Sequence, residues 1–259
     1  MSKIISIHSF RGGTGKSNTS ANISTLLAAQ GLRVGVVDTD IQSPGIHVLF
    51  GMEEEDMKFS LNDYLWGNCK IEQTAHDVTP NLAKNNGGKF SDNPNGKLFL
   101  IPSSMKTGEI ARVLREGYDV GMLNDGFMDL VEKLKLDVLV IDTHPGLNEE
   151  TLLSISLSDA LIIIMRPDQQ DYQGTGVTVE VARKLDVPKL IMLVNKTPPA
   201  LNEDQVKARV ENTYNCTVGA VIPHSDEIMT LASAGIFVLR YPDHSITAKL
   251  RHVANMLME

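Results

Sequence analysis

Cysteine is scarce in this 259-residue chain: only Cys69 and Cys216 are present, far apart and in no CxxC pair. This scarcity excludes a disulfide scaffold and a self-contained zinc or iron–sulfur site, and it suits a reducing compartment. Long apolar runs are also missing, because the longest, 161–165, is far too short to span a bilayer. Ser6 and His8 interrupt any signal-peptide core. We therefore expect a cytoplasmic protein.

Basic residues are outnumbered, with Lys+Arg 24 against Asp+Glu 32 and a formal net charge of -8. Such a protein repels nucleic acid on average, unless a local basic patch binds it. The composition, 42% hydrophobic and 22% charged, is that of a globular protein and excludes disordered, collagen-like and coiled-coil classes. Neither a repeat nor a convincing linker divides the chain, so we predict one domain over residues 1–259.

Short apolar runs rich in β-branched residues alternate with amphipathic stretches. This pattern predicts an α/β fold, a single-domain, mostly parallel twisted sheet of about seven or eight strands flanked by helices. Strands are expected at 4–9, 34–38, 98–101, 138–142, 161–165, 190–195 and 218–222. Several end in a polar residue, and these residues should ring one crevice at the carboxyl edge of the sheet: Ser9, Asp38, Asp142, Arg166 and Asn195. The turn-forming segment 84–96 is predicted to be a mobile surface loop.

A glycine-rich loop follows the first predicted strand. Glycines let the backbone wrap closely around phosphate oxygens, and the N-terminus of the following helix adds partial positive charge. Lys16 then reaches the β- and γ-phosphates, and the Ser17 hydroxyl can ligate Mg²⁺. The alternative is a glycine turn that merely precedes a helix. We predict a nucleoside triphosphate site whose cradle is formed by Gly12, Gly13, Thr14, Gly15, Lys16, Ser17 and Asn18.

Phe10 stands where the ordinary GxxxxGK[ST] pattern needs glycine. The loop instead resembles the deviant Walker A motif, xKGGxGK[ST], of the ParA/MinD family. Segment 36–40 (VVDTD) resembles that family's second box, and 139–146 (LVIDTHPG) resembles its Walker B and switch II motifs. Segment 221–227 (VIPHSDE) resembles the loop that closes over the base. The resemblance extends from about residue 3 to about residue 257 and is specific to the family, not to one member.

The resemblance implies slow, Mg²⁺-dependent ATP hydrolysis. Lys16 would hold the terminal phosphates, and Ser17 would coordinate Mg²⁺. Asp142 would support that ion from behind its direct ligands, with Asp38 nearby, and Asp40 would orient the attacking water. Phosphoryl transfer needs positioning and charge neutralisation more than covalent chemistry, so one cation, one metal and one carboxylate suffice. For Asp38 and Asp40 the alternative role is capping of the next helix.

The base is expected to contact Asn195, which begins the segment Asn-Lys-Thr-Pro. In GTPases a similar NKxD motif reads guanine through its Asp, but here Pro198 takes that place. The Asn195 amide can still donate to and accept from adenine. With Pro223 in the loop over the base, ATP is favoured over GTP.

Two positions depart from the family pattern. Arg11 replaces the signature lysine, which in the family crosses to the partner's nucleotide so that two ATP molecules are sandwiched between protomers. Arginine keeps the charge, so we expect Arg11 to act in trans, like an arginine finger, in an ATP-dependent homodimer. Alternatively it faces its own phosphate or solvent. His144 stands where many relatives have proline, either as a sensor of γ-phosphate or pH or as a satisfied loop histidine.

The family leaves several tasks open. The predicted one is a positioning ATPase whose ATP-bound dimer binds a surface until an adaptor or cargo protein stimulates hydrolysis. A maturation or metal-insertion ATPase of the Mrp or nitrogenase-iron-protein type would need paired cysteines. A tyrosine autokinase would need a tyrosine-rich tail, and no tyrosine follows Tyr241. A nucleotide-sensing regulator that does not form the ATP sandwich is a further alternative.

The C-terminal stretch bears on which surface is bound. Apolar residues recur there at helical spacing, at Ile246, Leu250, Val253 and Leu257. We expect a final helix packed on the sheet instead of a membrane-surface helix, and therefore no membrane binding. Lys249, Arg251 and Arg240 are either a small patch for non-specific DNA or a solvated face. DNA binding would make the protein nucleoid-associated.

Overall fold

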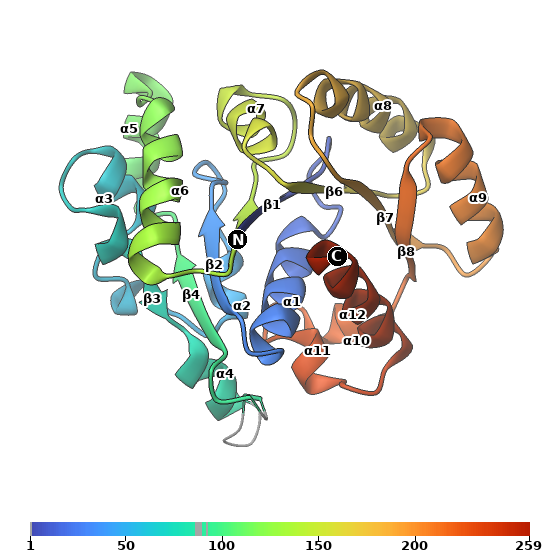
Figure 1. Cartoon of the computed structure of the whole chain (residues 1–259), viewed down its shortest axis with the longest axis horizontal. Helices are drawn as coiled ribbons and strands as arrows, with labels where there is room; N and C mark the ends of the chain where they lie inside the picture. Colours follow the sequence, from blue (N-terminus) through green and yellow to red (C-terminus); the bar gives the residue numbers. More distant parts are fainter. Residues whose placement is uncertain (1, 86–89, 92) are drawn as a thin grey trace.

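The computed structural model describes residues 2–85, 90, 91 and 93–259. They form an eight-stranded sheet in the order β3-β4-β2-β5-β1-β6-β7-β8 (Figure 1). The strands other than β3 run parallel, and β3 is antiparallel to β4. Their bounds are β1 Lys3–His8, β2 Arg33–Asp38, β3 His76–Asp77, β4 Lys97–Ile101, β5 Val138–Asp142, β6 Ala160–Met165, β7 Leu190–Thr197 and β8 Thr217–Pro223. The predicted α/β fold is confirmed.

All seven predicted strands are present, and their ends differ from the prediction by at most two residues. The additional strand is β3, an edge strand of only 2 residues. A segment so short carries no recognisable hydrophobic alternation, which is why the sequence did not reveal it.

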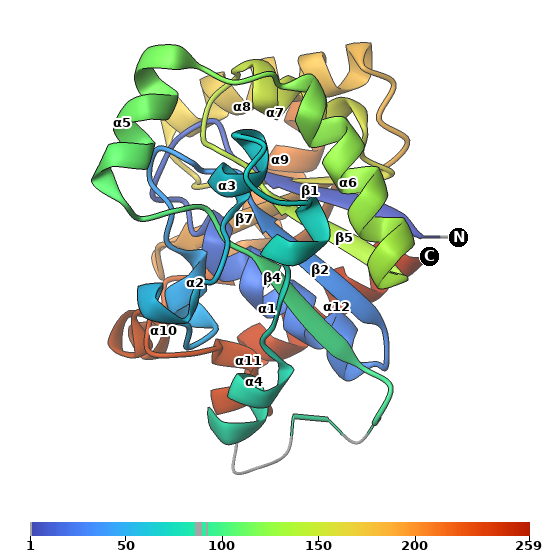
Figure 2. The ribbon, with the colours of Figure 1, turned by 90° about the vertical axis from the view of Figure 1, so that its left-hand side faces the viewer.

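Helices cover both faces of the sheet (Figures 1 and 2). Helices α1, α11 and α12 pack on one face, and α3, α6, α8 and α9 pack on the other. The bounds are α1 Lys16–Ala29, α2 Ile46–Leu49, α3 Leu61–Leu65, α4 Thr79–Asn85, α5 Thr107–Glu116, α6 Gly121–Leu134, α7 Glu149–Ser156, α8 Gln169–Lys184, α9 Glu203–Tyr214, α10 Asp226–Leu231, α11 Phe237–Arg240 and α12 Ser245–Met258.

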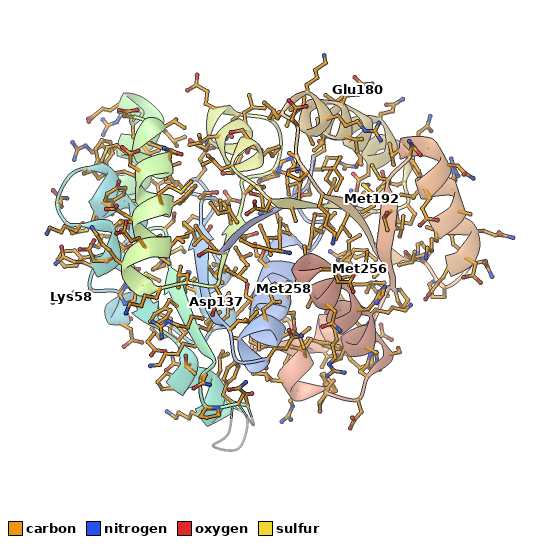
Figure 3. The ribbon with its side chains drawn as sticks, in the orientation of Figure 1. Lys58, Asp137, Glu180, Met192, Met256 and Met258 are labelled. Atoms are coloured by element: carbon orange, nitrogen blue, oxygen red, sulfur yellow. The ribbon has the colours of Figure 1, made fainter. Side chains whose placement is uncertain are left out.

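Strand β5 shows why the central strands are apolar throughout. Val138 and Val140 pack on the α1 side, whereas Leu139 and Ile141 pack on the α6 side. A strand covered on both faces needs apolar side chains at every position. In Figure 3 the side chain of Met192 lies within the packed interior, whereas Lys58 and Glu180 project at the periphery.

Helix α12 confirms the packed final helix. Its apolar face is buried against the α1 side of the sheet, through Ile246, Leu250, Val253 and Leu257. Lys3 Nζ donates a hydrogen bond of 2.9 Å to the Leu257 carbonyl, so the two ends of the fold lie side by side (Figure 2). Among the helices of the described residues, none combines the length and apolarity needed to cross a bilayer.

The predicted mobile loop 84–96 begins later than expected, because α4 continues to Asn85. Residues 86–89 and 92 lie outside the described residues. Beyond them the chain is tied to the end of α1, where Ser91 Oγ donates to the Ala29 carbonyl at 2.6 Å and Asn93 Nδ2 to the Gln30 carbonyl at 3.1 Å. The mobility of the segment stays a prediction.

Candidate nucleotide-binding site

The loop between β1 and α1 has the shape of a phosphate cradle. Gly13 and Gly15 adopt left-handed φ angles of 75° and 96°, which only glycine adopts without strain. Gly15 caps α1 without a side-chain hydrogen bond, so backbone N–H groups of the first turn are left for an anion. A Cβ on Gly13 would meet nothing within 4 Å, so the cradle is open there. This geometry fits a phosphate chain.

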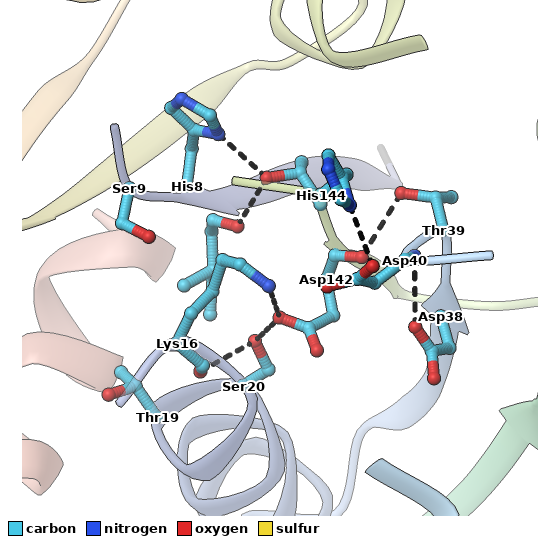
Figure 4. A network of polar contacts seen from close by, with 12 residues as sticks. His8, Ser9, Lys16, Thr19, Ser20, Asp38, Thr39, Asp40, Asp142 and His144 are labelled. Atoms are coloured by element: carbon cyan, nitrogen blue, oxygen red, sulfur yellow. Dashed lines mark hydrogen bonds and ion pairs between the residues drawn. The ribbon is translucent and has the colours of Figure 1, made fainter. Parts of the chain in front are cut away.

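Two carboxylates end neighbouring strands behind this loop (Figure 4). Asp38 of β2 pairs in register with Asp142 of β5, and both are buried. Lys16 Nζ lies 3.3 Å from Asp142 Oδ1, and Ser20 Oγ donates to the same oxygen at 2.9 Å. Asp142 Oδ2 is buried with no hydrogen-bond partner in the described part of the chain. Lys16 therefore balances a carboxylate pair that still has an unused oxygen.

The positive charge of Lys16 does not fully balance the Asp38–Asp142 carboxylate pair. Burial, together with the neighbouring Asp142, raises the pKa of Asp38 from 3.8 to about 7. The described residues contain no cluster of three or more His, Cys, Asp or Glu that could hold a metal. Mg²⁺ takes one or two protein carboxylates and completes its shell with phosphates and water, and the buried Asp38–Asp142 pair fits that requirement. Ser17, the third predicted ligand, lies half-buried in the first turn of α1, next to Lys16.

Asp40 lies two residues beyond Asp38 and is bound by His144. His144 Nδ1 is 2.7 Å from Asp40 Oδ1, an oxygen that also accepts from the Ser43 backbone N–H at 3.2 Å (Figure 4). His144 is thus a satisfied loop histidine, but its partner is the carboxylate predicted to orient water. The sequence analysis missed this pairing. The sequence did contain a sign of this contact. Asp38 and Asp142 end neighbouring strands in register, and Asp40 and His144 each lie two residues further along.

His8 is a second polar residue of the site that the sequence analysis did not select. It is buried at the end of β1, with Nδ1 2.8 Å from Thr143 Oγ1. Burial and the charge of Lys16 lower its pKa to about 3, so the ring is neutral at physiological pH. Because Thr143 Oγ1 also donates to the Ile7 carbonyl at 3.1 Å, this cluster fixes the start of the segment after β5 against β1.

Arg11 has an intramolecular partner that the sequence did not suggest. Its Nη1 atom lies 3.1 Å from Asp171 Oδ1 and 3.4 Å from Asp168 Oδ1, at the N-terminus of α8. Asp171 is 2% exposed and also accepts from the backbone and side chain of Arg166. In this structure the Arg11 guanidinium therefore pairs with carboxylates of its own chain, and its side chain stays 36% exposed. A role in trans would require it to leave these carboxylates.

A cavity of about 270 Å³ lies next to the phosphate loop, on the side where the base is predicted to bind. Gly15, Asn18, Asn195 and Pro223 all line it, so the two predicted base contacts do meet the loop. Asn195 Nδ2 donates to the Thr14 carbonyl at 2.7 Å. Polar residues, among them Thr19 and Asn22 of α1, also line the cavity. Sequence reasoning missed the apolar part of the wall, which the last three helices supply through Ile228, Met229, Phe237, Ile246 and Leu250.

The predicted basic patch is smaller in the structure than in the sequence. Lys249 Nζ pairs with Glu203 Oε2 at 2.5 Å and donates to the Val221 carbonyl at 2.8 Å. Its charge is therefore balanced within the fold. Arg240 and Arg251 are exposed.

Comparison with known proteins places this fold and site among P-loop ATPases. A protein-family model described as an AAA domain matches residues 2–189. An ATP-binding protein of Methanocaldococcus jannaschii is 27% identical over 100% of this chain and 88% of its own length. The septum site-determining protein MinD of Bacillus subtilis is 24% identical over 100% of this chain and 90% of its own length.

Solved structures agree in fold. The septum site-determining protein MinD from Pyrococcus horikoshii, complexed with Mg-ADP, has a TM-score of 0.76 and 21% identity over 99% of this chain and 96% of that chain. The family model covers well over half of the sequence. The chain belongs to this AAA-domain family and, within it, to the ParA/MinD-type P-loop ATPases.

The relatives are not all positioning proteins. An iron–sulfur cluster carrier protein of Pyrococcus abyssi is 27% identical over 74% of this chain and 60% of its own length. The family therefore defines the nucleotide-binding machinery, and the task must be argued from this chain's own residues.

Proposed function

We propose that this protein is an ATP-dependent dimerising switch ATPase that positions a cargo, a plasmid or chromosome, or a division component. In the proposed cycle the ATP-bound dimer binds a surface, and an adaptor or cargo protein stimulates hydrolysis and release. The observation that carries the proposal is that three separate features meet at the carboxyl edge of the sheet. These are the left-handed glycine loop, the Asp38–Asp142 pair and the cavity lined by Asn195 and Pro223.

Each group has a role that its surroundings support. We assign Lys16 to the terminal phosphates, together with Gly12, Gly13, Thr14, Gly15 and Asn18. Ser17, Asp38 and Asp142 would hold Mg²⁺, which when bound neutralises charge on the phosphates. Asp40 would orient the attacking water. Asn195 and Pro223 would contact the base, and the Asn195 amide suits adenine.

The homodimer is the part of the proposal that depends on Arg11. We infer that ATP binding releases Arg11 from Asp168 and Asp171, so that it can reach the partner's nucleotide. The Arg11 side chain is 36% exposed, and the buried Asp171 would keep its hydrogen bonds from the backbone and side chain of Arg166 when Arg11 leaves. Arg11→Ala should weaken ATP-dependent dimerisation, whereas Arg11→Lys, which restores the family residue, should retain it. An unchanged dimer constant in Arg11→Ala would refute the role in trans.

A metal-insertion task is less well supported by the cysteines. Burial and neighbouring acidic residues raise the pKa of Cys69 to about 11, and burial also raises the pKa of Cys216. Metal ligation requires the thiolate, which both environments disfavour. Non-specific DNA binding would rest on Arg240 and Arg251 and should weaken as salt rises.

The deciding experiment is the molar mass of Asp40→Ala in solution, measured by light scattering with and without Mg²⁺-ATP. Loss of the water-orienting carboxylate should leave binding intact and slow hydrolysis, so we expect a monomer that becomes a stable dimer only with ATP. Lys16→Ala is the control and should stay monomeric. A chain that binds ATP yet stays monomeric would favour a nucleotide-sensing regulator.

A further inference from the structure

The contact between His144 and Asp40 joins the segments that leave two neighbouring strands. Asp38 and Asp142 pair in register at the ends of β2 and β5, and Asp40 and His144 each lie two residues beyond. An ionised carboxylate only accepts hydrogen bonds, so His144 Nδ1 carries the proton and donates it across 2.7 Å.

The bond leaves one carboxylate oxygen unused. Asp40 Oδ1 accepts from both His144 Nδ1 and the Ser43 backbone N–H, while Oδ2 accepts nothing from the residues that the structure describes. The Asp40 side chain is only 13% exposed. A carboxylate fixed through one oxygen presents the other in a defined direction, which is what orienting a water molecule requires.

His144 is itself held on both sides. The Thr143 backbone N–H donates to the Ile7 carbonyl of β1 at 3.3 Å, and Thr151 Oγ1 of α7 donates to the His144 carbonyl at 3.3 Å. A donor supported in this way transmits its position to the group it binds. The contact in Figure 4 therefore links Asp40 to the segment that follows β5.

We propose that His144 is a positioning residue for hydrolysis, holding Asp40 Oδ1 so that Oδ2 faces the attacking water. This inference rests on the proposed ATPase function. Through this contact the histidine couples the segment after β5 to the carboxylate that is proposed to act on water.

The test is single-turnover ATP hydrolysis by the full chain with Mg²⁺, compared across matched variants. His144→Asn keeps an N–H donor close to the place of Nδ1, whereas His144→Gln moves its donor one bond further out. We expect His144→Gln and His144→Ala to slow hydrolysis by about 10-fold to 100-fold with ATP affinity retained. His144→Asn should stay within about threefold of wild type.

A double-mutant cycle separates positioning from general damage. In the Asp40→Ala background, His144→Ala should cause no further slowing, because the group that it positions is gone. The inference would be overturned if the wild type and His144→Ala hydrolysed ATP at equal rates, or if His144→Asn and His144→Gln slowed hydrolysis equally. It would also be overturned if the rate losses of Asp40→Ala and His144→Ala were additive in the double variant. Faster hydrolysis in His144→Ala would instead identify the contact as a latch that restrains Asp40. A wild-type rate no higher than that of Lys16→Ala would overturn the proposed function itself.

Discussion

The two ends of the nucleotide site are built by different means. At the phosphate end, polar side chains of α1 and of the segments that end β2 and β5 meet within hydrogen-bonding distance, as in the Lys16–Asp142 pair and the His144–Asp40 pair. At the base end, a largely apolar cavity is lined by side chains of α10, α11 and α12. Chemistry at the first end needs particular residue types, whereas shape at the second needs only apolar residues of suitable size.

The two ends are nevertheless tied together. Asn195 Nδ2 donates to the Thr14 carbonyl at 2.7 Å, and Lys196 Nζ donates to the Gly13 carbonyl at 2.8 Å. The phosphate loop is therefore held by the segment that is predicted to contact the base. Substitutions at either end can show how far the phosphate end and the base end contribute to nucleotide binding independently.

The largest effect is expected from Lys16→Ala, which disables the phosphate end alone. Lys16 is 7% exposed and is the cation of the buried Asp142 pair. Truncating one partner of a hydrogen-bonded charge pair between binding partners costs about 2–5 kcal/mol, so loss of the proposed Lys16–phosphate pair should lower ATP affinity by at least about 30-fold. Calorimetric titration with Mg²⁺-ATP measures this, with exposed Lys184→Ala as the control. Retained affinity would refute the phosphate-loop assignment.

A smaller effect is expected where the two ends touch. Gly13 and Gly15 share a left-handed backbone, so alanine at either should cost about 1–2 kcal/mol in the free energy of unfolding. Only at Gly15 would the new Cβ also lie 2.4 Å from Asn195 Nδ2. Gly15→Ala should therefore be the more destabilising in urea unfolding. Adding Asn195→Ala should remove the excess, and equal losses in the two single variants would contradict the close approach.

The contrast between the ends also explains what sequence could predict. Phosphate binding requires glycine at left-handed positions and a lysine at the helix start. Gly13, Gly15 and Lys16 can therefore be recognised from the sequence alone. The registered strands β2 and β5 likewise end in recognisable carboxylates. The cavity wall could not be predicted in the same way, because Phe237 and Leu250 follow the same apolar pattern as any core residue.

Ion pairs between residues far apart in the chain were the other feature that the sequence could not predict. The sequence left Arg11 facing a partner's nucleotide, its own phosphate or solvent. The structure pairs it with Asp168 and Asp171, about 160 positions along the chain. No local pattern encodes such a contact. His144 differs, since its offset from Asp142 matches that of Asp40 from Asp38 once the strands are known to be neighbours.

At the base end, Asn195→Ala should weaken binding less than the loss of Lys16. It removes the hydrogen bonds of one amide, and a net hydrogen bond contributes about 0.5–1.5 kcal/mol, so ATP affinity should fall by roughly 2-fold to 12-fold. The preference for ATP over GTP should fall with it, while the affinity for inorganic tripolyphosphate changes little. Lys196→Ala is the matched control, because it removes the other tie to the loop and keeps the amide. An unchanged preference in Asn195→Ala would argue against adenine recognition by Asn195.

A pH-dependent difference in stability is also expected between the wild type and Asp38→Asn. The pKa of Asp38 is about 7 in the folded chain against an ordinary value of 3.8, so between these values the folded state keeps a proton that the unfolded state has lost. Asp38 therefore favours folding less as pH rises through this window. Relative to Asp38→Asn, the wild type should lose stability between pH 5 and pH 8 in Mg²⁺-free urea unfolding. The opposite contribution of His8, whose pKa is lowered, is present in both proteins and cancels. A difference independent of pH would mean that Asp38 is ionised throughout.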